Sequence, residues 1–236
     1  ECPKCHSASV RFKGTGTQRV EDELKHLFPD ARIARMDMDT TTRKDAHRDI
    51  FQRVLNREAD ILLGTQMVTK GFDFPHVTLV GVISADTTLN LPDFRASERT
   101  FQLLTQVAGR TGRGQLGGEV IIQTYSLNHH SILNAKAHDY NTFYVQEISE
   151  RRELNYPPFG RMVGIQFLGK NEQRVIAEAK RFTRLLQKNG NYMVVLGPAP
   201  SVVARVRGQY RWHLIARSSH SKDMRDAVRR AWDKWE

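Results

Sequence analysis

Two arginines alternate with glycines in the segment QVAGRTGRG, residues 106–114. Glycine lets a backbone approach a ligand closely, and the guanidinium groups of Arg110 and Arg113 match phosphate oxygens through paired hydrogen bonds. Such groups can neutralise the charge that develops on a phosphoryl group while it is transferred. The alternative is a glycine-rich turn whose arginines are solvated.

A second polar segment, GTQMVTKGFDF at residues 64–74, begins where a predicted buried strand ends. In α/β sheets, ligands bind at the carboxyl ends of the strands. Five residues suit such a site: Thr65 and Gln66 offer hydrogen bonds, Lys70 a cation, Gly71 close backbone approach and Asp73 a carboxylate. The alternative is a turn that Asp73 caps.

The chain has two cysteines, Cys2 and Cys5, in the segment ECPKC. Cys-x-x-Cys spacing can direct two thiolates at one metal ion, but a closed structural zinc site needs four ligands. The neighbouring His6 is poorly placed to be a third ligand. A redox-active pair would need a preceding strand and a following helix, and neither is expected here. Two thiolates supply half of such a site, so the sequence leaves its other ligands open.

The positive charge of the chain is concentrated in its C-terminal third. Residues 151–236 hold 18 Lys and Arg against 7 Asp and Glu, a net +11, whereas residues 1–150 hold 18 against 19, a net −1. An excess confined to one part of a chain indicates an anionic partner, first of all nucleic acid. The alternative is a basic surface that only keeps the protein soluble.

A predicted amphipathic helix over residues 171–189 gathers part of this charge. At about 100° per residue, its basic side chains fall within about 80° of one another, opposite an apolar stripe. The basic residues are Arg174, Arg181, Arg184 and Lys188, and the stripe consists of Val175, Ala179, Phe182 and Leu186. The pattern predicts one face packed on a core and one face that can contact phosphates.

More basic residues follow in a predicted hairpin centred on Gly208. Arg205, Arg207 and Arg211 lie close in sequence to Tyr210 and Trp212, and this combination suits phosphate neutralisation and base stacking on a single strand. Tyr210 and Trp212 share one face of a strand, so core packing is the alternative for one or both.

The elements that must position the first set of residues alternate along the chain. Apolar periodicity predicts helices around residues 17–28, 50–55 and 95–107, and strands over 31–37, 59–64, 77–84 and 117–124. Such alternation predicts an α/β fold, a parallel sheet with helices on its faces and right-handed crossovers. Residues 129–154 are expected to be mostly helical and to end at YPPF, residues 156–159, because consecutive prolines cannot continue a helix.

The pattern changes after YPPF. Strands are expected over 161–169, 194–196, 202–206 and 212–216, with helices over 171–189 and 223–235. We expect a larger α/β domain at 13–155 and a basic α+β domain at 156–236, preceded by the cysteine-containing segment 1–12.

Composition sets outer limits. The 236 residues are 39% hydrophobic and 26% charged, which is ordinary for a soluble globular protein. The sequence contains no apolar run long enough to cross a membrane and no secretory signal, and two cysteines at this spacing do not form a disulfide framework. We expect a reducing, cytoplasmic compartment and no membrane partner.

The pair Q-x-x-G-R-x-G-R and G-T-x-x-x-x-K-G-x-D resembles motifs VI and V of superfamily 2 helicases, which lie in the second RecA-like lobe. ADILLGTQMVTKGFDFPHVTLV, PDFRASER and YPPF narrow this to the PriA-like bacterial replication-restart helicases. The resemblance runs from Cys2 to the end of the chain and is most specific between Ala59 and Arg113. It implies an ATP-dependent 3′-to-5′ DNA helicase, active at stalled forks, that initiates primosome assembly.

The resemblance assigns roles to the motif residues. Arg110 and Arg113 would reach the γ-phosphate of ATP·Mg²⁺, and Gln106, with Gly109 and Gly71 close by, would contact nucleotide. Asp73 would contact the ribose or the motif VI arginines. Thr65, with Gln66 and Lys70, would contact DNA. The role of PDFRASER does not follow from it, and Arg95 and Arg99 are expected to pair with Asp93 and Glu98.

The family also carries a cysteine-rich insertion that binds two zinc ions, and CPKC resembles its last Cys-x-x-Cys pair. The resemblance therefore implies that residues 1–12 are a remnant of that insertion and that Cys2 and Cys5 are half of one zinc site. No G-x-x-x-x-G-K-[ST] and no D-E-x-H motif is present, so we expect a C-terminal part that is inactive alone. The implied partners are forked and single-stranded DNA, single-stranded DNA-binding protein and primosome proteins. Alternatives are a RecG-like translocase or a non-catalytic zinc-knuckle nucleic-acid-binding module.

Overall fold

The computed structural model describes residues 16–37, 46–65, 74, 76–109, 117–189 and 193–235. Two compact units divide the chain, Glu1–Tyr140 and Asn141–Glu236. The expected domain limits of 1–12, 13–155 and 156–236 remain a prediction, and the first of these segments lies outside the described residues.

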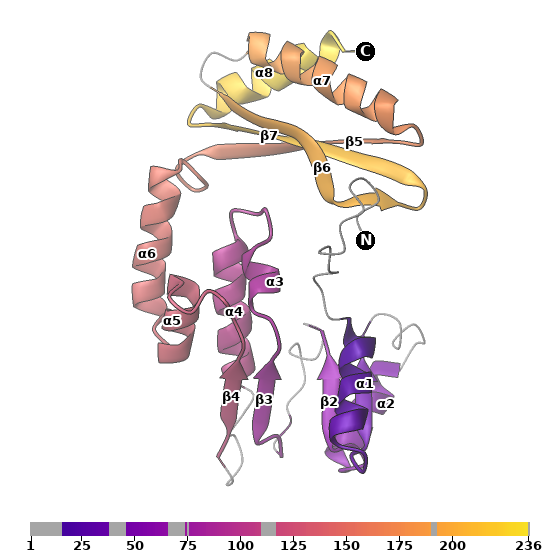
Figure 1. Cartoon of the computed structure of the whole chain (residues 1–236). Coiled ribbons are helices and arrows are strands. Elements are labelled where there is room, and N and C mark those ends of the chain that lie inside the picture. The colour runs from indigo at the N-terminus through magenta and orange to yellow at the C-terminus, as the bar shows by residue number, and fades with distance from the viewer. Residues whose placement is uncertain are drawn as a thin grey trace. The chain divides into compact units, whose positions relative to one another are not determined.

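The first unit contains two pairs of parallel strands (Figure 1). β1 (Ile33–Met36) pairs with β2 (Ile61–Gly64), and β3 (Leu79–Val82) pairs with β4 (Glu119–Ile122). α1 (Thr17–Leu27) packs on β1 and β2, and α2 (Ala46–Leu55) packs on β1. The α/β class with parallel strands is therefore confirmed.

The second pair of strands is accompanied by three helices. α3 (Asp86–Leu89) and α5 (His130–Ala137) both pack on α4 (Ala96–Ala108), which also contacts β4. The apolar side of α4 buries Phe101, Leu104 and Val107. α4 thereby positions Gln106 and Gly109, the part of the predicted motif that the structure describes.

The second unit consists of α6 (Tyr140–Glu153), of which only the first residue belongs to the first unit, and a helix-covered antiparallel sheet. The strands are β5 (Arg161–Gly169), β6 (Val194–Val206) and β7 (Gln209–Ser218), in the order β5-β7-β6. α7 (Glu172–Asn189) and α8 (Ser221–Asp233) cover one face of this sheet (Figure 1). The small α+β domain is as expected.

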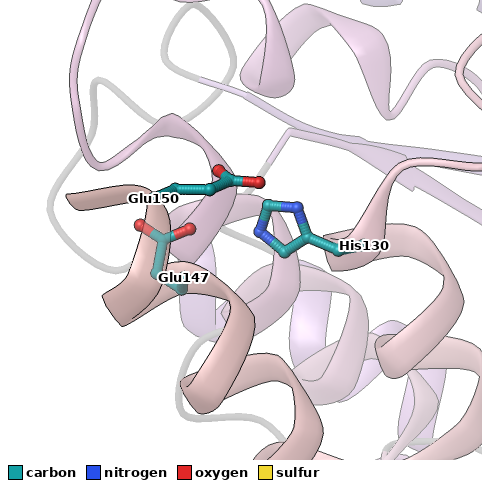
Figure 2. Close-up of side chains that lie close together, drawn as sticks. All are labelled: His130, Glu147 and Glu150. Atoms are coloured by element: carbon teal, nitrogen blue, oxygen red, sulfur yellow. The ribbon is translucent and has the colours of Figure 1, made fainter. Parts of the chain in front are cut away.

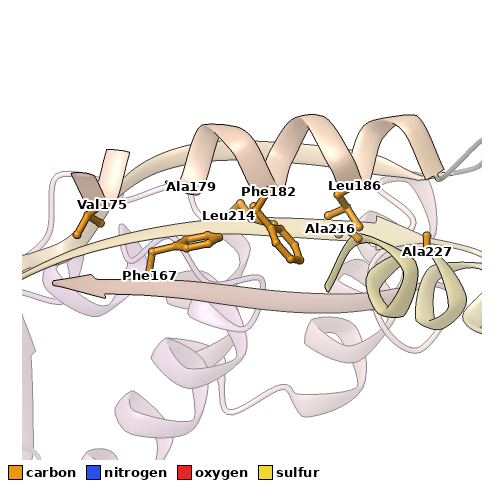
Figure 3. Packing of buried hydrophobic residues seen from close by; sticks show 9 residues of the cluster. Phe167, Val175, Ala179, Phe182, Leu186, Leu214, Ala216 and Ala227 are labelled. Atoms are coloured by element: carbon orange, nitrogen blue, oxygen red, sulfur yellow. The ribbon is translucent and has the colours of Figure 1, made fainter. Parts of the chain in front are cut away.

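The core of the second unit lies between this sheet face and the two helices (Figure 3). Phe182 of α7 is 1% exposed and meets Phe167 of β5 edge to face at 5.8 Å between ring centroids. The predicted apolar stripe of α7 is confirmed, because Val175, Ala179, Phe182 and Leu186 are all buried. Such burial stabilises a small domain by about 25 cal/mol for each Å² of apolar surface.

A close backbone approach joins α6 to β5. Asn155 adopts a left-handed conformation, φ 53°, just after α6. A Cβ atom on Gly160 would lie 2.1 Å from the carbonyl oxygen of Asn155, so only glycine fits there. The turn around the YPPF segment therefore depends on Gly160, which directly follows it.

None of the helices in the described part of the chain is long and apolar enough to cross a membrane.

Candidate nucleic-acid interface

Three residues predicted to contact nucleotide or DNA lie in the described part of the first unit. Thr65 is exposed and directly follows β2, so it stands at the carboxyl end of a parallel strand, as expected. Gln106 is half-buried in the last turn of α4, and Gly109 is the exposed C-cap of that helix. Gly109 has φ −71°, and a Cβ there would make only ordinary contacts, so its backbone does not require glycine.

The other residues of these motifs lie outside the described residues, and their roles remain predictions. They are Gln66, Lys70, Gly71, Asp73, Arg110 and Arg113, together with Cys2 and Cys5.

The PDFRASER segment is a charged start of α4. Asp93 binds Arg99 at 2.8 Å and Arg95 at 3.5 Å through their guanidinium nitrogens, and the backbone N–H of Arg95 donates to the same carboxylate at 3.0 Å. Burial works to raise the pKa of Asp93, but the Arg95 N–H and the two guanidinium groups outweigh it and hold that pKa below its usual range. The expected pairing with Asp93 is confirmed, which gives these arginines a structural role.

Sequence reasoning missed a buried carboxylate, Asp86, at the start of α3. It accepts hydrogen bonds from the Thr124 hydroxyl at 3.1 Å, the Tyr125 backbone N–H at 2.9 Å and the Ser126 hydroxyl at 3.0 Å. Burial works to raise the pKa of Asp86, but these donors together lower it. The carboxylate fixes the chain after the carboxyl end of β4. Its signal in the sequence was weak, because one Asp in ADTTLN reads equally well as a surface cap.

A second cluster of carboxylates lies on α6. Glu147 and Glu150 are on the same side of the helix, one turn apart (Figure 2). Glu147 is buried and accepts hydrogen bonds from Arg151, whose guanidinium nitrogens lie 2.8 Å from the carboxylate. The pair with Arg151 explains why this acid tolerates burial.

The basic face of α7, defined as Arg174, Arg181, Arg184 and Lys188, is exposed along its whole length. Arg181 has one weak partner, Glu178, at 3.6 Å. Arg184 and Lys188 form no ion pair with any residue that the structure describes. Because the opposite side of α7 is sealed into the core, this face is held in place and available to phosphates.

The hairpin between β6 and β7 holds the other predicted DNA contacts. Trp212 is half-buried and packs against the core, which favours core packing over base stacking for this residue. Tyr210 is half-buried beneath Arg205, whose guanidinium carbon lies 4.9 Å from the ring centroid. Arg207 is exposed at the tip. With the Gln166 amide turned so that its oxygen faces Arg211, that oxygen accepts from Arg211 Nε at 3.2 Å and Nη2 at 2.8 Å.

Two family models match the chain, one for each unit's main part. Residues 10–115 match the helicase conserved C-terminal domain, and residues 152–235 match the C-terminal domain of primosomal protein N. Replication restart protein PriA of Bacillus subtilis (strain 168) is 50% identical over 215 residues, which are 91% of this chain. The chain belongs to the PriA family. The family resemblance drawn from motifs V and VI is therefore confirmed.

Other PriA proteins are similar over a comparable length of this chain. That of Synechocystis is 47% identical over 220 residues, 92% of this chain, and that of Treponema pallidum is 42% identical over 218 residues. The chain spans 27%, 26% and 33% of the lengths of the three PriA proteins. The RecG-like and zinc-knuckle alternatives gain no support from these matches.

Proposed function

We propose that this chain forms the second motor lobe and a DNA-binding domain of an ATP-dependent 3′-to-5′ DNA helicase that restarts replication at stalled or collapsed forks. The helicase C-terminal model over the first unit and the relatives named replication restart proteins support the motor. A lobe of this type supplies arginines to an ATP·Mg²⁺ site whose phosphate loop belongs to another lobe. Primosome proteins and single-stranded DNA-binding protein are the proposed protein partners, in the bacterial cytoplasm.

Zinc is a proposed structural metal of the intact protein, with Cys2 and Cys5 as two of the four thiolates that a closed site requires. Metal coordination would hold the chain that leads into the second lobe.

One observation carries the DNA-binding part: the basic face of α7 stands on a sealed core, in a segment of net +11. Such a face can bind DNA phosphates, because each phosphate that it neutralises releases condensed counterions and this release favours binding. Arg184 and Lys188 favour this role because no carboxylate among the described residues pairs with them, whereas a structural arginine such as Arg99 is held by Asp93.

The test compares salt dependence of DNA binding in two triple variants. Arg181→Ala with Arg184→Ala and Lys188→Ala should weaken binding to single-stranded and forked DNA and flatten the plot of log affinity against log salt by about 2 to 3. The matched control replaces Lys222, Arg225 and Arg229 on α8, which are also exposed and also one side of a helix. Equal changes in both variants would show that net charge alone matters and would move the interface away from α7.

A further inference from the structure

The turn at the tip of the β6–β7 hairpin has a backbone conformation that is unfavourable for one of its residues, Arg207. Val206 pairs with Gln209, so Arg207 and Gly208 form a two-residue loop, with φ 49° and 79°. Positive φ at both positions defines the type I′ turn, which favours Asn-Gly or Gly-Gly. An arginine in this conformation opposes its own Cβ sterics. Folding of the hairpin therefore does not explain why arginine stands at its tip.

The strand that leads to the tip is also irregular. The register shifts between the pairs Pro200↔Trp212 and Arg205↔Tyr210, so four residues of β6, 201–204, face one residue of β7. Extra residues of this kind leave the ladder and re-aim side chains. Val202 and Val203 are in this bulge and are 68% and 55% exposed, and Val206 beside the tip is 39% exposed. Three branched apolar side chains in and next to this bulge are thus exposed to solvent.

The charged residues near these valines in the sequence of the hairpin are all positive. Residues 202–212 include three arginines, Arg205, Arg207 and Arg211, and no Asp or Glu. Arg205 is held over Tyr210, and Arg211 is held by Gln166, so both guanidinium groups are oriented. Arg207 has no hydrogen-bond or ion-pair partner among the residues that the structure describes.

We propose that the end of this hairpin, residues 202–207, packs Val202, Val203 and Val206 against the terminal base pair of a DNA duplex, at the point where the duplex meets single strands. The arginines of the hairpin bind the flanking phosphates. Duplex DNA hides its base faces in the stack, except where the stack ends. A terminal base pair is therefore a flat apolar surface framed by phosphates, which complements an apolar tip framed by arginines. The inference rests on the proposed DNA-binding function and adds the structure in DNA that the hairpin reads.

The experiment measures affinity of the whole chain for a fork, for the fork's single strand, and for the same duplex with both ends closed by loops. Val202→Ser with Val203→Ser should lower affinity for the fork about fivefold, and change affinity for the single strand by less than about twofold. The wild type should bind the closed duplex more weakly than the fork, whereas the variant should bind the closed duplex and the fork equally. Val194→Ser is the matched control, since Val194 is 47% exposed on the same strand and distant from the tip in sequence.

Arg207→Gly separates a turn role from a DNA role. Glycine fits φ 49° without strain, so the variant should unfold at the same temperature as the wild type or higher, yet bind the fork more weakly. A 2-aminopurine at the terminal base pair of the fork should change its fluorescence on binding wild type and much less with either hairpin variant.

Two other results would be decisive. If the valine variant keeps the wild-type preference for the fork over both other DNAs, or the wild type has no such preference, the hairpin inference is wrong while α7 can still bind DNA. If the wild type binds none of the three DNAs, the proposed DNA-binding function fails with it.

Discussion

The surface ion pair between Arg32 and Asp60 fixes the backbone of the strands beside it as well as pairing two charges. Arg32 donates to Asp60 from its backbone N–H at 2.8 Å, from Nε at 2.9 Å and from Nη2 at 2.8 Å. The same guanidinium also donates to the Arg57 carbonyl oxygen at 2.7 Å. The Arg32 side-chain and backbone donors lower the pKa of Asp60 from 3.8 to about 2. This fork connects the residue before β1 with the residue before β2, and so aligns the two parallel strands at their start.

The pH dependence of this pair has a definite sign. A depressed pKa means that the folded state binds the Asp60 proton less readily than the unfolded chain does. Its stabilising contribution is therefore complete above about pH 4 and is lost as the pH falls through about 2. Arg32→Gln should return the Asp60 pKa toward 3.8 in a carbon-detected NMR titration. A carboxyl that still titrates near 2 in that variant would show that the Arg32 guanidinium group is not the cause.

At the scale of elements, the amphipathic design of α7 joins stability to function. Phe182 is the centre of this design, with ring centroids 6.0 Å from Trp235 and 6.4 Å from Trp232. Its ring and those of Phe167 and the two tryptophans meet mostly edge to face, a geometry that aromatic pairs favour. The basic face can therefore keep its exposed position only while this cluster is intact.

Phe182→Ala should lower the free energy of unfolding of the second unit by about 3 to 5 kcal/mol, because it leaves a cavity in a closed cluster. The measurement is urea unfolding followed by tryptophan fluorescence, since Trp212, Trp232 and Trp235 all belong to this unit. Leu168→Ala is the control. Leu168 follows Phe167 on β5 and is 55% exposed, so its truncation should lower the free energy of unfolding only a little. Similar losses in both variants would mean that Phe182 is not a core residue.

Periodicity predicted most of these elements because it reports burial directly. The stripe of α7 and the strands at 31–37, 59–64, 77–84 and 117–124 all coincide with observed elements. Residues 129–154 are mostly helical, as expected, but they form two helices, α5 and α6. His138 ends α5 in the left-handed conformation, φ 54°, and the N–H groups of His138 and Asp139 donate to the last carbonyl groups of α5. Histidine gives no such signal in the sequence, whereas glycine would have.

The hairpin shows a second limit. Strands were expected separately at 194–196 and 202–206, but β6 runs continuously over Val194–Val206 with two register shifts. A bulge depends on pairing with a distant strand, and local periodicity contains no information on that pairing. For the site, charge and helical angle located the basic face of α7, while the fixed conformations of Asp86 and Arg207 depend on contacts and turns that only the folded chain defines.

At the scale of the whole molecule, the chain separates two tasks. The first 150 residues are nearly neutral, with net charge −1, and contain the helicase motifs, while the remainder has net charge +11. A motor lobe must close and open on nucleotide in each cycle, and a strongly basic surface on it would bind DNA in every state. We therefore propose that most of the binding to DNA phosphates belongs to the second unit, in addition to the contacts predicted for Thr65, Gln66 and Lys70 in the first.

We propose that the first unit is the second lobe of an ATP-driven motor, with Arg113 at the transferring phosphoryl group. Charge shifts on the γ-phosphoryl as the bond breaks, so a guanidinium there stabilises the transition state more than bound ATP. The most direct measurement is DNA-stimulated ATP turnover and nucleotide affinity of the full-length protein with Arg113→Ala, beside the surface control Arg53→Ala. We predict that turnover falls about 10³-fold or more with nucleotide affinity largely kept, that Arg113→Lys rescues it only in part, and that Arg53→Ala is unaffected. Turnover of Arg113→Ala within a few-fold of wild type would show that Arg113 does not act on the phosphoryl group, and QVAGRTGRG would then be a structural or DNA-contacting turn.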